Sequence, residues 1–120
     1  MHDIPITVYR GYKRTSTFIT DTTRALANLV NSFVPGEVYN IGGNDFHTIE
    51  EAADIILRLL GKEAQRERLV VFKNEEVLTT REKKVDCSKA HRQLGLKSTV
   101  SLEDGIRQTL EWMKDVYRKP

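Results

Sequence analysis

The chain has 120 residues, of which 39% are hydrophobic and 30% charged, and its formal net charge is +2. This is the composition of an ordinary globular domain, and the mixing of charge signs argues against a protein dominated by nucleic-acid or membrane binding. Cys87 is the only cysteine, so no internal disulfide can form, and no apolar run approaches the roughly 20 residues of a membrane span. We expect a single cytoplasmic domain over residues 1–120.

The first part of the chain predicts a strand followed by a helix. Residues 6–9, ITVY, are β-branched or aromatic and predict a strand, which the polar RGYKR segment ends in a turn. Apolar residues then recur at helical spacing and predict a helix over residues 21–33. Thr20 or Asp21 is its expected N-cap, and the helix should end before Pro35.

The middle of the chain predicts a second strand and a second helix. Residues 37–42, EVYNIG, favour a short and largely buried strand that ends in a turn at Gly42-Gly43. The surrounding IGGNDFHTI matches neither a dinucleotide fingerprint nor a P-loop, so we expect these glycines to serve a turn with positive φ rather than a phosphate. Thr48 and Glu51 form a T-x-x-E capping box and predict a helix that runs to Gly61.

The last part adds one strand and two helices. Residues 69–72, LVVF, predict a third strand, and the polar residues 73–84 predict a loop. Ser88 opens a short helix, and Ser101 with Asp104 forms a second capping box for the final one. The alternation predicts a small mixed α/β fold with about three short strands and four helices.

Three features resemble reactive groups, and each has a simpler interpretation. Tyr9 and Lys13 match a Y-x-x-x-K pattern, which requires a helix, whereas a strand end with Gly11 inside it is expected here. His47 has no ligand-type neighbour at metal spacing and is predicted to be a surface or turn residue. Cys87 lies at a helix start, where its thiol pKa could be lowered, but a small packing residue is the favoured interpretation.

Two arginines and one basic run are candidate binding residues. Arg14 precedes a Thr/Ser cluster and Arg81 lies in the polar loop, and guanidinium groups suit diphosphates because they donate paired, charge-assisted hydrogen bonds. The alternative for both is solvated surface charge. The basic region Lys83–Lys97 suggests a free-standing interaction module that binds nucleic acid, although its acids and its lack of interleaved aromatic residues disfavour this alternative.

Several stretches together resemble the C-terminal lobe of the extended short-chain dehydrogenase/reductases, the NAD-dependent nucleotide-sugar epimerases and dehydratases. EVYNIGGNDFHTIEEAADIILRLLG resembles the middle of that lobe, and VDCSKAHRQLGLKSTVSLEDGIRQTLEWMKD resembles its end. RTSTFITDTTRA is similar to the R-D-F-x-x-V-x-D-V-x-x-A segment of the family, which places Arg14 on its arginine and Asp21 on its second aspartate. Arg81 matches an arginine that the dehydratases and decarboxylases carry.

The resemblance implies the substrate-binding lobe of a longer enzyme, expressed as a fragment or encoded apart and not catalytic alone. The glycine-rich NAD loop and the Tyr-x-x-x-Lys helix of the family precede the matched region, so NAD is implied for the complete enzyme and no cofactor for this chain alone. Arg14 and Arg81 would clamp the diphosphate of a UDP- or dTDP-sugar, and the complete enzyme would resemble a dTDP-glucose 4,6-dehydratase. Asp21 would be structural and cap its helix. The implied partners are the nucleotide-sugar and the Rossmann half, not nucleic acid or a membrane.

Overall fold

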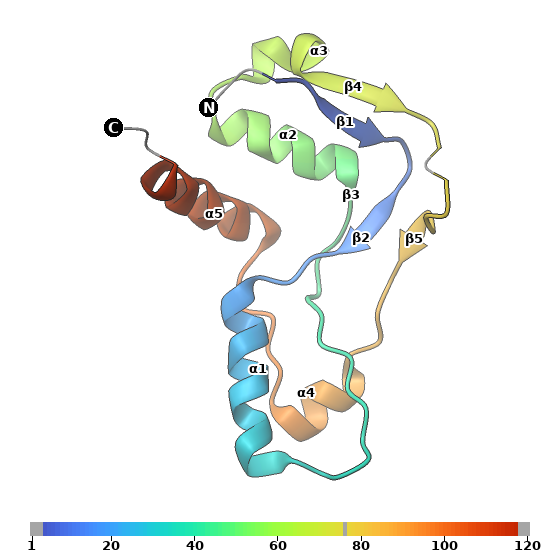
Figure 1. The fold of residues 1–120 in the computed structure, drawn as a ribbon, viewed down its shortest axis with the longest axis vertical. Coiled ribbons are helices and arrows are strands. Elements are labelled where there is room, and N and C mark those ends of the chain that lie inside the picture. The colour runs from blue at the N-terminus through green and yellow to red at the C-terminus, as the bar shows by residue number, and fades with distance from the viewer. Residues whose placement is uncertain (1–3, 76, 118–120) are drawn as a thin grey trace.

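The computed structural model describes residues 4–75 and 77–117, so the predicted loop over 73–84 includes one residue, Glu76, that lies outside the described part. The described part contains five short strands, five α-helices and one 3-10 turn (Figure 1). This mixed α/β architecture confirms the predicted fold class. The strands that the sequence did not predict are only two or three residues long, too short for an alternating pattern to be visible.

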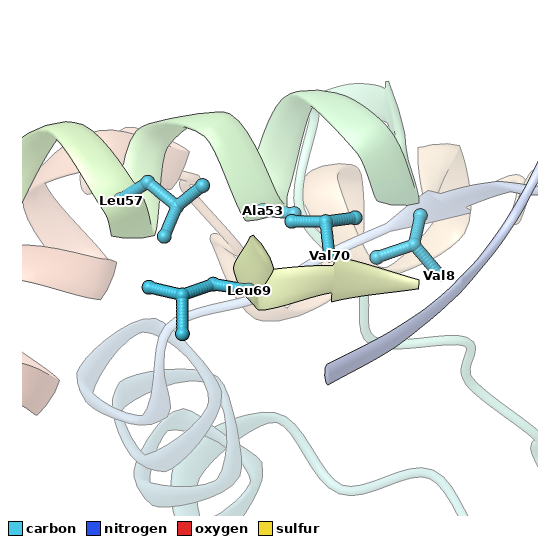
Figure 2. Packing of buried hydrophobic residues seen from close by; sticks show 5 residues of the cluster. All are labelled: Val8, Ala53, Leu57, Leu69 and Val70. Atoms are coloured by element: carbon cyan, nitrogen blue, oxygen red, sulfur yellow. The ribbon is translucent and has the colours of Figure 1, made fainter. Parts of the chain in front are cut away.

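One end of the molecule is a helix packed on a two-stranded sheet. Strand β1 (Ile6–Tyr9) pairs in parallel with β4 (Val70–Lys73), and helix α2 (Ile49–Leu59) lies across the pair. Between them, 3-10 turn η1 (Glu63–Gln65) and the short helix α3 (Arg66–Leu69) lead from α2 into β4. Figure 2 shows the side chains that fill the space beneath α2, which are Val8, Ala53, Leu57, Leu69 and Val70.

A three-stranded sheet continues from this end toward the middle of the molecule. Its order is β3 (Phe46–Thr48), β2 (Lys13–Thr15) and β5 (Glu82–Lys83), with β2 antiparallel to β3 and parallel to β5. In this register Arg14 lies opposite His47 on one side and Lys83 on the other. The sheet therefore places three segments that are far apart in sequence side by side.

The opposite end is built by two helices around a second core. Helix α1 (Ile19–Ser32) packs against α4 (Ser88–Leu94), as Figure 1 shows. The last helix, α5 (Leu102–Val116), returns to pack against α2 at the first end. The buried residues of this second core come from α1, from α4 and from the segments that flank α4, and they are Ala25, Cys87, Ala90, Leu94 and Leu96.

The molecule is elongated. Its radius of gyration is 17.0 Å and its extents are 50 × 38 × 20 Å, whereas a compact domain of this length has a radius of gyration of about 14 Å. The two cores share no residue. Many large apolar side chains are correspondingly exposed, among them Val30, Phe33, Val38 and Trp112.

The predicted strand over residues 37–42 is wrong. A strand exists only when a neighbouring strand pairs with it, and among the described residues no backbone–backbone hydrogen bond involves residues 38–41. The segment is held through side chains instead. Tyr39 and Ile41 pack against the second core, and the Asn40 Nδ2 donates to the carbonyl of Asp86 at 3.1 Å.

Both capping boxes predicted from local spacing form their main hydrogen bond, which runs from the backbone N–H of the third helical residue to the side chain of the N-cap residue. The Glu51 N–H donates to Thr48 Oγ1 at 3.0 Å, and Glu51 Oε2 accepts from the Thr48 N–H at 2.7 Å, which completes the box. At α5 the Asp104 N–H donates to Ser101 Oγ at 3.1 Å. The Asp104 carboxylate, however, accepts from the Ser101 hydroxyl and not from its backbone. Helix α1 begins at Ile19 and has no side-chain cap, so the predicted caps at Thr20 or Asp21 are wrong.

Candidate functional site

Arg14 and Arg81 meet where β2 pairs with the segment that enters β5. The Lys13 N–H donates to the carbonyl of Arg81 at 2.7 Å. Nη1 of Arg14 donates to two carbonyls, that of Lys13 at 2.7 Å and that of Arg81 at 3.1 Å. A guanidinium has five N–H donors. These two bonds therefore fix the position of the Arg14 side chain and leave other N–H groups for further acceptors. The structure thus brings together the two arginines that the sequence predicts as ligands.

The environment of the two arginines is positively charged and partly aromatic. The Arg14 guanidinium lies 5.6 Å from the ring centre of buried Tyr12. Arg81 is exposed, and its Nη2 lies 3.3 Å from the carboxylate of Glu75. Because both side chains of that ion pair are exposed, the pair is weak enough for a bound anion to compete with Glu75.

Phe46 anchors two lysines beside the arginines. The ammonium groups of Lys13 and Lys84 lie 5.8 Å and 5.9 Å from its ring centre. Lys13 also pairs with Glu82 at 3.1 Å. The three-stranded sheet therefore carries several cations over a small area, a suitable field for an anionic ligand.

Asp21 is fully buried and does not cap its own helix. Its carboxylate accepts from the Thr99 N–H at 2.9 Å, the Thr99 hydroxyl at 2.6 Å and the Val100 N–H at 3.2 Å. Burial raises the pKa of this carboxyl, but the bonds from Thr99 and Val100 and the charge of Arg24 outweigh it, and the pKa is lowered. Asp21 thus joins α1 to the segment that leads into α5. Its structural role is as predicted, whereas its bonding partners are not.

His47 is buried, so its prediction as a surface or turn residue is wrong. It lies in β3, where its Nε2 is 3.2 Å from Ser16 Oγ and its Nδ1 is 3.0 Å from the carbonyl of Asp45. The short strand gave no sequence signal for this position. Tyr9 and Lys13 lie in two different strands and share no helix face, so their Y-x-x-x-K match has no structural counterpart.

The two glycines of the Gly-Gly turn allow other segments of the chain to lie close to the turn. Neither has a positive φ, so the turn type predicted from the sequence is wrong. A Cβ on Gly43 would lie 2.0 Å from the carbonyl oxygen of Ser16, and one on Gly42 would lie 3.1 Å from the Cys87 sulfur. The position of a Cβ at residue 43 is filled by the backbone of Ser16, so the close approach of the two segments requires glycine there.

Cys87 is a buried packing residue of the second core. It is 6% exposed, and burial raises the pKa of its thiol, with the Gly42 N–H opposing this and the charge of Asp86 adding to it. The alternative of a lowered thiol pKa is wrong.

We expect an aromatic disulfide reagent to label native Cys87 at least about 100-fold more slowly at pH 7 than the urea-unfolded chain. Because Cys87 is the only thiol, the absorbance of the released thiolate reports on it alone. Equal labelling rates for the native and the unfolded chain would contradict the buried position.

Two clefts lie near the site, and neither is lined by Arg14 or Arg81. The larger, of about 740 Å³, lies between α2, β3 and the start of α5, and the smaller, of about 280 Å³, lies between α5 and residues 16–18. The arginines of the larger cleft are neutralised, because Arg58 makes two bonds to Glu103, at 3.0 and 2.9 Å, and Arg66 two to Asp54. Within the described residues, no acid, histidine or cysteine cluster could hold a metal ion, and no helix has the length and apolarity needed to span a membrane.

No model of a known protein family matches the chain. Individual enzymes are nevertheless similar to it in sequence. The dTDP-glucose 4,6-dehydratase of Neisseria gonorrhoeae is 33% identical over 106 residues, which are 82% of this chain and 31% of that enzyme. The UDP-glucuronate 4-epimerase of Thermodesulfobacterium geofontis is 34% identical over 80 residues, which are 66% of this chain and 24% of that enzyme.

Solved structures match in the same way. The UDP-glucuronic acid 4-epimerase of Bacillus cereus, in complex with UDP-glucuronic acid and NAD, superposes with a TM-score of 0.83 at 28% identity. The match covers 96% of this chain and 37% of the epimerase chain. The chain thus spans about a third of the length of its relatives. It belongs to the NAD-dependent epimerase/dehydratase family and corresponds to the C-terminal lobe of the extended short-chain dehydrogenase/reductases.

Proposed function

We propose that this chain is the cytoplasmic nucleotide-sugar-binding lobe of an NAD-dependent epimerase or dehydratase, and that it is not catalytic alone. Arg14 and Arg81 would hold the diphosphate of a UDP- or dTDP-sugar. The observation that carries the proposal is the bond from the Arg14 guanidinium to the backbone carbonyl of Arg81, which places the Arg14 side chain against the Arg81 backbone on a cationic sheet. The similar epimerase of Bacillus cereus was solved with UDP-glucuronic acid and NAD, which supports this ligand class.

The role of the two arginines is to orient the substrate. Each guanidinium can donate parallel, charge-assisted bonds to phosphate oxygens. Because backbone carbonyls from two segments already fix Arg14, little side-chain entropy remains to be lost when the diphosphate binds. Binding energy spent on the diphosphate then orients the sugar at a reacting centre outside this chain.

We propose that NAD is held outside this chain. A dinucleotide site needs glycines whose backbone is open to a pyrophosphate, and beside Gly43 the Ser16 carbonyl fills that position. A Rossmann half would hold NAD, which supplies the transient removal of hydride from the sugar. We propose that half as the protein partner of this chain.

The alternative nucleic-acid module receives no support from the arrangement of the basic region Lys83–Lys97. Lys83 and Lys84 lie at the three-stranded sheet, whereas Lys89 pairs with Glu37 at the far end of the molecule. His91 is engaged with the carbonyl of Leu96 at 2.7 Å. The basic residues thus form no continuous stripe along which a nucleic-acid backbone could run.

We expect millimolar UDP-glucose or dTDP-glucose to shift the arginine Nε signals of Arg14 and Arg81 in NMR spectra of the labelled chain. Affinity should be weak, and Arg14→Ala should lower it by at least about 10-fold because the charge-assisted bonds to the diphosphate are lost. Arg14→Lys should restore only part of the affinity, because an ammonium group cannot donate two parallel hydrogen bonds to the diphosphate.

Arg92→Ala is the matched control, because Arg92 is an exposed arginine of α4 at the other end of the molecule. It should leave the titration unchanged. Tight binding of NAD, or shifts that map to α4 and not to the sheet, would contradict the proposed function.

A further inference from the structure

A hydrogen-bonded chain of three groups links the turn before β3 to the end of the strand that carries Arg14. Nδ1 of His47 lies 3.0 Å from the carbonyl of Asp45, and its Nε2 lies 3.2 Å from the hydroxyl of Ser16. The His47 side chain is only 8% exposed, whereas Ser16 is exposed and borders the smaller cleft. A buried imidazole therefore holds a hydroxyl group that a ligand can reach.

The partners of His47 determine which of its ring nitrogens carries the proton. A carbonyl oxygen can only accept a hydrogen bond, so Nδ1 must donate to Asp45. In the neutral ring Nε2 is then an acceptor, and the Ser16 hydroxyl gives its hydrogen to Nε2. In this state the Ser16 hydroxyl has no hydrogen left to donate to an anion.

Protonation of His47 reverses the direction of this bond. Both ring nitrogens of an imidazolium are donors, so Nε2 then donates to the Ser16 oxygen, and the hydroxyl hydrogen is free to turn toward a ligand. A positive charge also lies next to the hydroxyl in this state. The same pair of side chains therefore offers an anion a hydrogen-bond donor only when the imidazole is protonated.

The Ser16–His47 pair lies beside the proposed diphosphate site. His47 is the register partner of Arg14 where β2 pairs with β3, and residues directly opposite each other carry their side chains on the same face of a sheet. Ser16 follows Arg14 by two residues, which separates their Cα atoms by at most about 7 Å. A ligand that Arg14 holds at one phosphate therefore has its second phosphate within reach of the Ser16 hydroxyl.

Charged groups face His47 from both sides. On the three-stranded sheet the cations of Arg14 and Lys83 lie in register with it, and both favour a bound anion. The larger cleft, which His47 also lines, contributes carboxylates and guanidinium groups from the turn before β3, from α2, from η1 and from α3. These groups are Asp45, Glu51, Asp54, Glu63, Arg58 and Arg66.

Most of the charged groups of the cleft are already engaged. Arg66 pairs with Asp54, and Arg58 pairs with Glu103 of α5. The carboxylates of Asp45 and Glu51 accept backbone N–H groups. A phosphate that enters the site is therefore the main change in charge near His47, and its negative charge favours the imidazolium.

We propose that Ser16 is a further ligand of the diphosphate and that His47 is its positioning residue, which turns the hydroxyl toward the ligand when the imidazole is protonated. The identity of the ligand rests on the proposed function. Because the diphosphate of a nucleotide-sugar is a diester without a group that titrates between about pH 5 and pH 8, a change of affinity in this range belongs to the protein. By linkage, binding of the anion takes up a proton at His47.

The position of the proton is tested first, in the chain without ligand. Long-range proton–nitrogen NMR spectra of the 15N-labelled chain report which ring nitrogen of His47 is protonated. At about pH 8 the proton should be on Nδ1. A proton on Nε2 at this pH would overturn the positioning role, because Ser16 would then receive a hydrogen bond from the neutral ring.

The affinity for UDP-glucose is measured next, from the shift of the Arg14 Nε signal. It should be at least about 5-fold higher at about pH 5 than at about pH 8, because one charge-assisted hydrogen bond is gained. Ser16→Ala should lower the affinity about 5-fold at the lower pH and less than about 2-fold at the higher one. The hydroxyl donates to the ligand in the first state only.

Two histidine substitutions test whether the pH dependence originates at His47. The amide nitrogen of His47→Gln can donate to Ser16 at either pH and does not titrate, so this variant should bind UDP-glucose equally at both. His91→Gln is the matched control, because Nδ1 of His91 also bonds a carbonyl, that of Leu96, but at the far end of the molecule. It should keep the pH dependence of the wild-type chain. Ser16 is exposed, so Ser16→Ala gives a folded test even if the buried substitution does not.

The outcomes separate this inference from the proposed function. Equal affinity of the wild-type chain at both pH values, or a loss in Ser16→Ala that is the same at both, would overturn the roles of Ser16 and His47 and leave the arginine site intact. A pH dependence that His91→Gln removes would do the same. If UDP-glucose shifted the Arg14 signal at neither pH, the proposed function and this inference would both be wrong.

Discussion

Gly43→Ala is expected to cost at least about 3 kcal/mol of unfolding free energy, because the added methyl group has no room. It would lie 2.0 Å from the carbonyl oxygen of Ser16 and 3.1 Å from its carbonyl carbon, so a backbone segment must move. That segment joins β2, which carries Arg14, to α1. We therefore expect the substitution to weaken nucleotide-sugar binding as well. Urea unfolding followed by circular dichroism measures the first effect.

Two other glycines provide graded controls for this prediction. At Gly36 the φ is +83° and there is open space around the position, so Gly36→Ala should cost only about 1 kcal/mol of backbone strain. At Gly42 the added methyl group meets the Cys87 sulfur at 3.1 Å, a side-chain atom that can adjust, and an intermediate loss is expected. If Gly43→Ala were no worse than Gly36→Ala, the approach of Ser16 to the turn would not be the reason for glycine there.

Asp21→Ala is expected to destabilise the chain by about 3 kcal/mol or more. The substitution leaves two N–H groups, those of Thr99 and Val100, without their acceptor and removes three hydrogen bonds to a buried charged group. Thr99→Val removes only the hydroxyl donor and should cost about 1 kcal/mol. Arg24→Ala removes a half-exposed ion-pair partner 3.6 Å away and should cost less than about 0.5 kcal/mol.

The same carboxylate gives the stability of the chain a defined pH dependence. Its pKa is lowered in the folded state below the usual value of 3.8, so the contribution of Asp21 is fully present above that value. It is lost as the pH falls through the lower, folded-state pKa. The unfolding free energy of the wild-type chain should therefore approach that of Asp21→Ala as the pH falls below 3.8. A difference between the two chains that does not shrink in this range would contradict the assignment.

The features that could be predicted from the sequence are those whose partners are close along the chain. The box of Thr48 and Glu51 closes over three residues, and its geometry follows from helix spacing alone. Such local rules predicted the ends of most helices to within a few residues.

The errors arise where a residue takes its role from a distant partner. Asp21 was expected to cap its own helix, but the donors that it satisfies lie 78 and 79 residues away. Residues 37–42 have the composition of a strand, yet a strand also needs a neighbour, which no local pattern can supply. Glycine at position 43 is compatible with positive φ or with close contact, and only the position of Ser16 distinguishes the two. The pairing of Arg14 with Arg81 could be anticipated only through resemblance to a family.

The bond that joins these two arginines also has a kinetic consequence. Arg14 and Arg81 are separated by 67 residues, and β2 pairs with β5 only when that long loop closes. Closing it requires ordering most of the chain between them, so the contact forms late in folding, after the helices. During synthesis, the proposed diphosphate site cannot form until residues 81–83 have left the ribosome. A growing chain can therefore acquire its proposed affinity for a charged metabolite no earlier than the synthesis of β5, which follows α1, α2 and α3 and precedes α4 and α5.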